Sequence, residues 1–227
     1  MWCSANFVQR PVPTLVKTHT LASKNMPPYT EQYIQLERFC SMPGQAVILK
    51  DKDIQNIFQV VPSLRNKLLF AIGIYTGLRI GEIIRLETDQ VLTENGTVRN
   101  KLVVKRLKKR ATVYSDIPIH PKLRSYIREY ALSTTLGTWL FPSTRSQSGH
   151  IERVQAHYIM RNAFDALRID GSKTHSMRRT FLTTLSRMGV PLRTIQEMSG
   201  HSSLSQLQAY LAVDPEDTRD AVHRLRY

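Results

Sequence analysis

Two stretches near the C-terminus, HSMRRTFLTTL at residues 175–185 and MSGHSSLSQLQAYL at residues 198–211, decide the fold and chemistry expected for this chain. They place His175, Arg178, His201 and Tyr210 at successive intervals of 3, 23 and 9 residues. A phenol attacks phosphorus at neutral pH only beside a base and positive charge, which the histidines and the arginine can supply. His175 lies three residues before Arg178, so both can share one helical face. The set therefore predicts metal-free breaking and rejoining of a phosphodiester.

A second arginine stands upstream, in TGLRIGEIIRL at residues 76–86. Gly77 is suited to a helix end, and the turn would present Arg79 at the start of the next helix. Phosphodiester cleavage passes through a state with extra negative charge, which a planar guanidinium stabilises while holding two oxygens. Arg79 and Arg178 are therefore the candidates for a phosphate clamp.

The composition favours a nucleic-acid partner. The chain has 227 residues, 41% of them hydrophobic, and a net charge of +14 from 32 Lys and Arg against 18 Asp and Glu. Such an excess attracts a polyanion, although a solvated basic surface or a ribosome-associated protein would share it. Cys3 and Cys40 form no CxxC pair, and no apolar run reaches the ~18 residues of a membrane span. We expect a cytoplasmic protein that needs no cofactor and no metal.

The hydrophobic pattern changes along the chain. Residues 1–47 are proline-rich and are predicted to be an arm or linker, whereas residues 48–227 form the predicted catalytic domain. The expected fold class is mostly α with a small antiparallel β-sheet (α+β), with strands within 98–119 and a polar loop at 143–149. Helices are expected over about 51–61, 64–74, 80–86, 120–132 (apolar face Leu123, Ile127 and Leu132), 154–167, 178–188, 192–199, 204–210 and 215–225.

The run RNKLVVKRLKKR at residues 99–110 holds seven basic residues and no acidic one. Such a run usually contacts DNA phosphates. A lysine at a strand turn can also protonate the leaving 5′ oxygen as a general acid. Lys105, Lys108 and Lys109 are the alternatives, of which Lys108 is favoured. The predicted phosphate contacts are Lys101, Lys105, Arg106, Lys109, Arg110 and, outside this run, Arg179.

These motifs resemble those of the tyrosine recombinase (phage-type integrase) family. The stretch at 175–185 is similar to its H-x-L-R-H-T-F-A-T box, the one at 198–211 to its L-G-H-x-S…T-x-x-Y box, and the one at 76–86 to its first arginine box, so the likeness covers residues 48–223. The resemblance implies a site-specific DNA recombinase with a 3′-phosphotyrosyl intermediate. It implies the following roles: phosphate clamp for Arg79 and Arg178, base for His175, second histidine for His201, strand-turn lysine for Lys108, nucleophile for Tyr210, and an orienting carboxylate for Glu82.

The resemblance also implies partners. Double-stranded DNA is the expected substrate, in integration, excision or resolution, within a prokaryotic, nucleoid-associated, plasmid or phage context. A C-terminal helix at residues 214–227 would dock on a neighbouring subunit of a tetramer, or else pack on its own domain. A type IB topoisomerase-like nicking-closing enzyme is an alternative. A non-catalytic DNA-binding regulator is another, and the intact residue set argues against it.

The sequence departs from the family pattern at four places. The basic run lacks the K-x-G pattern, Arg179 replaces a common histidine, and Leu207-Gln208 replaces the threonine that usually precedes the nucleophile. Residues 1–47 are too short for the helical DNA-clamping domain of ~100 residues that family members usually carry. A minimal recombinase, an accessory protein that supplies this function, and a truncated chain are the three explanations.

Overall fold

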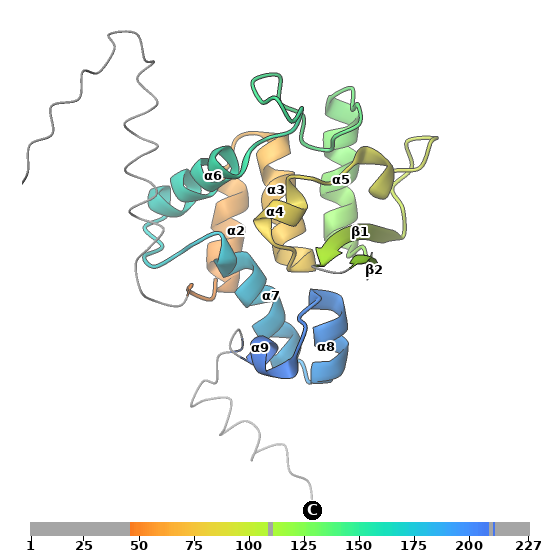
Figure 1. The fold of residues 1–227 in the computed structure, drawn as a ribbon. Helices are drawn as coiled ribbons and strands as arrows, with labels where there is room; N and C mark the ends of the chain where they lie inside the picture. Colours follow the sequence, from red (N-terminus) through yellow and green to blue (C-terminus); the bar gives the residue numbers. More distant parts are fainter. Residues whose placement is uncertain (1–45, 109–110, 209–210, 212–227) are drawn as a thin grey trace, which may run out of the picture. The chain divides into compact units, whose positions relative to one another are not determined.

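The chain folds into helices and one small two-stranded sheet in the computed structural model, which describes residues 46–108, 111–208 and 211 (Figure 1). This confirms the expected fold class. All of these residues belong to one unit, Pro43–Tyr227. The elements are α2 (Asp51–Val60), α3 (Leu64–Thr76), α4 (Ile80–Ile83), a 3-10 helix η1 (Thr88–Gln90), β1 (Lys101–Lys108), β2 (Ala111–Pro118), α5 (Pro121–Ser133), α6 (Arg153–Ala166), α7 (His175–Arg187), α8 (Leu192–Ser199) and α9 (Leu204–Gln208).

Two glycines end the helices that matter most for the site. Gly77 closes α3 with φ 63° and Gly200 closes α8 with φ 69°, both in the left-handed region that residues with a Cβ rarely adopt. The helices expected over 64–74 and 192–199 are thereby confirmed. The expected helix at 178–188 begins three residues earlier, at His175.

Two details of the expected helices are wrong. The helix expected over 80–86 ends at Ile83, because the backbone then pairs with another segment: the Leu140 amide donates to the Leu86 carbonyl at 2.9 Å. Leu132 is 82% exposed and does not belong to the apolar face of α5. Tyr130 takes that place, because it lies three residues after Ile127 whereas Leu132 lies five residues after it.

The sheet is a hairpin whose register is fixed. Lys101 pairs with Pro118 and Lys108 with Ala111, so residues 109 and 110 connect the strands. Side chains alternate between the two faces of a strand. Leu102 and Val104 are accordingly buried on the inner face, whereas Lys105 lies exposed on the outer face.

Helix α7 joins two hydrophobic clusters. Met177, near its start, belongs to the large cluster, which includes most buried residues of α3, α5 and α6. Leu182, one and a half turns later, belongs to a small cluster with Ile195 of α8 and Leu207 of α9. Figure 1 shows α7 leading from the side of α2 and α3 to the α8–α9 pair. Helix α7 therefore contributes directly to the relative placement of α3 and α8.

The segment before α2 is attached to the same unit. The Val47 amide donates to the Gly171 carbonyl at 3.4 Å, and the Leu49 amide donates to Thr180 Oγ1 at 2.8 Å. The domain boundary expected at residue 47 stays a prediction. Within the described ranges, no helix is long and apolar enough to span a bilayer.

We expect Gly77→Ala to destabilise the fold more than Gly96→Ala, as measured by urea unfolding. Both glycines have positive φ, 63° and 72°, which costs about 1–2 kcal/mol for an alanine. A Cβ at Gly77 would also meet the Phe181 ring, whereas nothing lies within 4 Å at Gly96. Overpacking adds about 1–3 kcal/mol at Gly77. Equal losses in the two variants would contradict this close packing of α3 on α7.

Candidate active site

Arg178 lies at the centre of the candidate site. Its side chain is 1% exposed, and its terminal nitrogens donate to two backbone carbonyls: Nη1 to Gly77 O at 2.6 Å and Nη2 to Ser199 O at 2.9 Å. One carbonyl follows α3 and the other ends α8. The three stretches singled out in the sequence therefore meet at this guanidinium, and two of the predicted residues, Arg178 and His201, are in direct contact.

His201 is held in a defined orientation. Arg178 Nη2 lies 3.1 Å from His201 Nε2, and Ser199 Oγ lies 2.7 Å from Nδ1. A guanidinium only donates, so Nε2 accepts and Nδ1 carries the ring proton. Ser199 Oγ in turn donates a hydrogen bond to Gln196 O at 3.1 Å. Gln196 also donates to the His201 carbonyl at 3.2 Å, which fixes the loop as well as the ring.

The surroundings keep His201 neutral. The residue is 6% exposed. Burial, followed by the charges of Arg178, Arg79 and Arg106, lowers the pKa of His201 to about 4. A neutral ring at pH 7 agrees with its role as the acceptor of a hydrogen bond from Arg178. Donation of a hydrogen bond from His201 Nε2 to a phosphate would require a different hydrogen-bond arrangement from this one.

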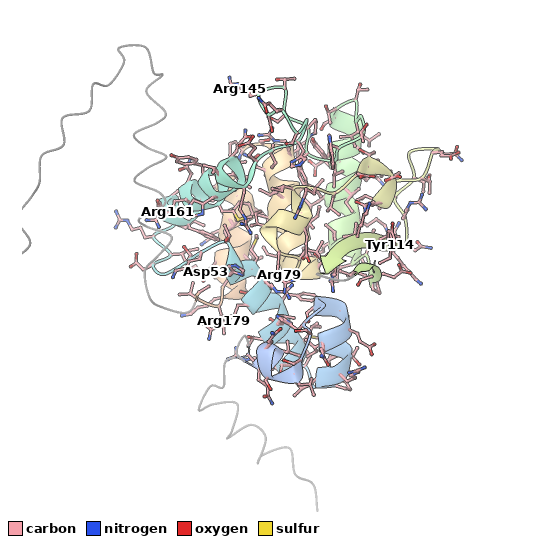
Figure 2. The ribbon with its side chains drawn as sticks, in the orientation of Figure 1. Asp53, Arg79, Tyr114, Arg145, Arg161 and Arg179 are labelled. Atoms are coloured by element: carbon pink, nitrogen blue, oxygen red, sulfur yellow. The ribbon has the colours of Figure 1, made fainter. Side chains whose placement is uncertain are left out.

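Arg79 and Glu82 form a pair at the start of α4. Arg79 is the N-cap residue, and its amide donates to Glu82 Oε2 at 2.8 Å. Its Nη1 lies 3.3 Å from Glu82 Oε1, with the arginine side chain 39% and the carboxylate side chain 14% exposed. Arg79 thus presents a guanidinium to solvent from the helix start, as the sequence predicted (Figure 2). The Glu82 carboxylate thus contacts both the amide and the guanidinium of Arg79, and its orienting role stays a prediction.

His175 begins α7, one turn before Arg178. Partial burial, and then the charges of Arg178, Arg79 and Arg153, lower its pKa. No sequence motif marks Arg153, and the sequence did not predict it as a site residue. It begins α6, and its Nη2 would lie 3.8 Å from a Cβ added at Gly81, next to α4. Arg85 Nη2 would lie 3.6 Å from the same point, so two further cations border the site.

The basic run splits between two faces. Lys101 and Lys105 are exposed on the outer face of β1, and Lys101 Nζ lies 3.5 Å from Asp116 Oδ2. Arg106, which the sequence grouped with the phosphate contacts, is instead buried, at 4% exposure. Its Nη2 donates to Met198 O, at the end of α8, at 2.6 Å.

Of the remaining expected residues, Arg179 lies in the described part of the structure and the others lie wholly or partly outside it. Arg179 is half-buried and donates from Nη1 to Ala46 O at 2.6 Å. Lys108 is the last residue of β1, but its side chain is outside the described part of the structure. Lys109, Arg110, Tyr210 and the expected C-terminal helix also lie outside the described residues. Within the described ranges, no three His, Cys, Asp or Glu side chains gather in a group that could hold a metal ion.

Comparison with known proteins gives a consistent family. The model of the phage integrase family matches residues 48–217. The tyrosine recombinase XerA of Pyrococcus furiosus is 28% identical over 182 residues, 78% of this chain and 60% of that protein. The probable integrase/recombinase YoeC of Bacillus subtilis is 29% identical, over 75% of this chain and 92% of its own length. Tyrosine recombinase XerD of Rhizobium meliloti is 32% identical, over 72% of this chain and 52% of that protein.

Solved structures share the fold. The crystal structure of XerA recombinase has a TM-score of 0.68 at 22% identity, covering 82% of this chain and 68% of that one. The XerH site-specific recombinase bound to its difH substrate has a TM-score of 0.64 at 20% identity, and the match covers 80% of this chain and 54% of that one. The chain therefore spans little more than half the length of several relatives that it matches. The family match covers most of the chain and includes all three motifs around Arg178, and this protein belongs to the phage integrase family of tyrosine recombinases.

Proposed function

We propose that the protein is a site-specific recombinase that cleaves and rejoins duplex DNA through Tyr210. The observation that carries this proposal is the buried network in which Arg178 bridges Gly77, Ser199 and the neutral His201. A protein that only binds DNA has no need to hold an arginine and a histidine together in the interior. The solvent-facing Arg79 beside this network adds the second cation of a phosphate clamp.

The first step is attack of Tyr210 Oη on the scissile phosphorus. The phenolic proton passes to His175, whose lowered pKa leaves it neutral and able to accept at pH 7. Arg79 and Arg178 stabilise the added negative charge of the transition state. The bond from phosphorus to the 5′ oxygen breaks, and the phosphate remains on Tyr210 as a 3′-phosphotyrosyl ester.

The leaving 5′ oxygen takes a proton from Lys108. The place of Lys108 in the hairpin supports this choice, because it is the last residue of β1, directly before the strand connection, whereas Lys105 lies in mid-strand on the outer face. A 5′ hydroxyl of a partner strand then reverses the attack. The phosphotyrosyl bond conserves the energy of the broken phosphodiester, so no nucleotide hydrolysis is required.

Electrostatics support DNA as the partner. The net charge is +14, and Arg85 and Arg153 lie beside the start of α4 next to Arg79. Lys101 and Lys105 are exposed on the outer face of the hairpin, where phosphates can reach them. Binding through such contacts releases counterions, so the affinity falls steeply with salt.

We further propose assembly as a tetramer on paired DNA sites, through the C-terminal helix. Met188 and Leu204, beside the small cluster of α7, α8 and α9, are 72% and 42% exposed and offer apolar surface for a neighbouring subunit. An accessory protein that clamps DNA is a further proposed partner. Relatives in bacteria and an archaeon support a prokaryotic, nucleoid-associated setting, with a plasmid or phage as the proposed replicon.

The proposed function predicts a covalent adduct between the protein and nicked duplex DNA. A random-sequence duplex library with a nick beside the variable region traps cleavage, because the short released fragment, which carries the freed 5′ hydroxyl, diffuses away before rejoining. Protein–DNA species that survive denaturation are collected and sequenced. We expect an enriched sequence from the wild-type chain and none from Tyr210→Phe. An adduct that persists in Tyr210→Phe would show that another nucleophile acts, and no wild-type adduct despite tight binding would contradict the proposed activity.

The general acid can be identified by single-lysine variants on the recovered duplex. We expect Lys108→Ala to slow adduct formation about 100-fold or more, the usual contribution of a general acid. Lys109→Ala should slow it far less, because the proposal assigns the proton transfer to one lysine, Lys108. Rates are compared in single-turnover gels. A large loss in Lys109→Ala with full activity in Lys108→Ala would reassign the role.

The neutral state of His201 predicts a pH-dependent stability. Its pKa is about 4 in the folded protein and about 6.5 when unfolded, so the unfolded chain binds the extra proton between these values. Stability from this residue is therefore complete above pH 6.5 and is lost as the pH falls towards 4. We expect the loss in free energy of unfolding between pH 7 and 4.5 to be on the order of 2 kcal/mol smaller in His201→Asn. If wild type and His201→Asn lose the same free energy of unfolding, measured by urea unfolding, His201 titrates normally.

A further inference from the structure

Arg106 is a buried cation outside the catalytic set. Its side chain is 4% exposed, and its Nη2 donates to Met198 O at 2.6 Å across 92 residues of sequence. A guanidinium at this exposure on the inner face of β1 cannot make an ordinary surface contact with DNA. Figure 2 shows Tyr114, which is 63% exposed, on the outer side of the same hairpin. The function of Arg106 must therefore lie within the protein.

The space around Arg106 is formed by Gly200. A Cβ added at Gly200 would lie 2.7 Å from Arg106 Cζ, closer than atoms can pack, and 3.1 Å from Cδ, which is a tight contact. The glycine also has φ 69° at the end of α8. The guanidinium thus packs against the backbone of the turn between Met198 and His201, and the hairpin and this turn cannot move independently.

The charge of Arg106 connects it to the second part of the site. Its Nε lies 3.9 Å from Glu82 Oε1, the same oxygen that lies 3.3 Å from Arg79 Nη1. Burial lowers the pKa of Arg106, the Glu82 charge raises it, and the Arg79 charge lowers it. One carboxylate is therefore shared between an exposed arginine and a buried one.

The arrangement is costly for stability alone. Arg106 Nε and Nη1 have no hydrogen-bond partner within the described part of the chain. Buried donors without partners destabilise a fold, and buried ion pairs can often be replaced by apolar side chains without loss. A residue kept for packing alone would more simply be apolar, like Leu102 and Val104 on the same face of the strand.

We propose that Arg106 is a positioning residue, which holds the strand end bearing Lys108 against the His201 turn and the Arg79–Glu82 pair. This inference rests on the proposed function, because it concerns protonation of the leaving 5′ oxygen. Lys108 lies two residues after Arg106 and is the last residue of β1. Fixing Arg106 to Met198 therefore fixes the register and distance of position 108 relative to the phosphate clamp.

Replacement of the leaving oxygen provides a specific test. In a 5′-bridging phosphorothiolate duplex, sulfur replaces the 5′ oxygen at the scissile phosphate. Attack by Tyr210 then breaks a P–S bond, and the thiolate leaves with its electron pair and needs no proton at neutral pH. A defect in delivering the proton disappears on this substrate, whereas a defect in nucleophile, clamp or folding remains.

The experiment compares wild type, Arg106→Gln, Arg106→Met and Lys108→Ala on oxygen and sulfur versions of the recovered duplex. Arg128→Gln, an exposed arginine of α5 away from the site, is the matched control. We expect the Arg106 variants to cleave the oxygen duplex about 100-fold more slowly than wild type and the sulfur duplex within about threefold of it. Near wild-type cleavage of the sulfur duplex by Arg106→Met would show that the variant is folded, which separates positioning from stability.

A second measurement does not depend on catalysis. Amide hydrogen exchange in peptides covering residues 101–118 and 196–203 should become about tenfold faster in Arg106→Met, because one charged hydrogen bond holds both segments. Unchanged exchange in either segment, normal cleavage of the oxygen duplex, or equal losses on both duplexes would each overturn the role. A wild-type chain that cleaves neither duplex would instead contradict the proposed function, and the tie between the segments would then be judged by exchange alone.

Discussion

The structure depends on compensation of one buried positive charge, that of Arg178. Two helices, α3 and α8, end at left-handed glycines, and a carbonyl at each of these ends accepts a hydrogen bond from the Arg178 guanidinium. Helix C-termini carry unsatisfied carbonyls and a partial negative charge. The cation therefore replaces water at two helix ends at once. Because it also donates to His201, the geometry of the site follows from the same compensation that makes its burial tolerable.

The sequence predicted the parts of this arrangement that are local. Glycine conformations and helical spacing determine where α3 and α8 end, and both ends were found without any tertiary information. Errors occurred where distant segments compete with local preference. Leu86 leaves its expected helix to pair with Leu140, and Leu132 points to solvent because Tyr130 covers the core.

Motif spacing predicted which residues belong to the candidate site, but it did not predict the hydrogen bonds between them. Residue chemistry and the family resemblance together singled out Arg79, Arg178 and His201 as candidates, and their roles stay predictions. The position of Arg106 depends on Met198, 92 residues away, and no local pattern encodes that contact. A signal for its burial did exist, since Leu102 and Val104 mark the even positions of β1 as the apolar face. The alternation is hard to recognise in the sequence, because basic residues occupy both odd and even positions of the run.

The small cluster of Leu182, Ile195 and Leu207 gives α8 and α9 much less buried surface than the rest of the unit. Elements with few apolar contacts open at a lower free energy than the global unfolding of a domain. Local opening of α8 would separate Ser199 and His201 from Arg178, so the clamp and the histidine would be lost together. A ligand that engages only the closed form stabilises it by mass action. Binding of an anion at Arg178 and the order of α8 and α9 would then report the same equilibrium.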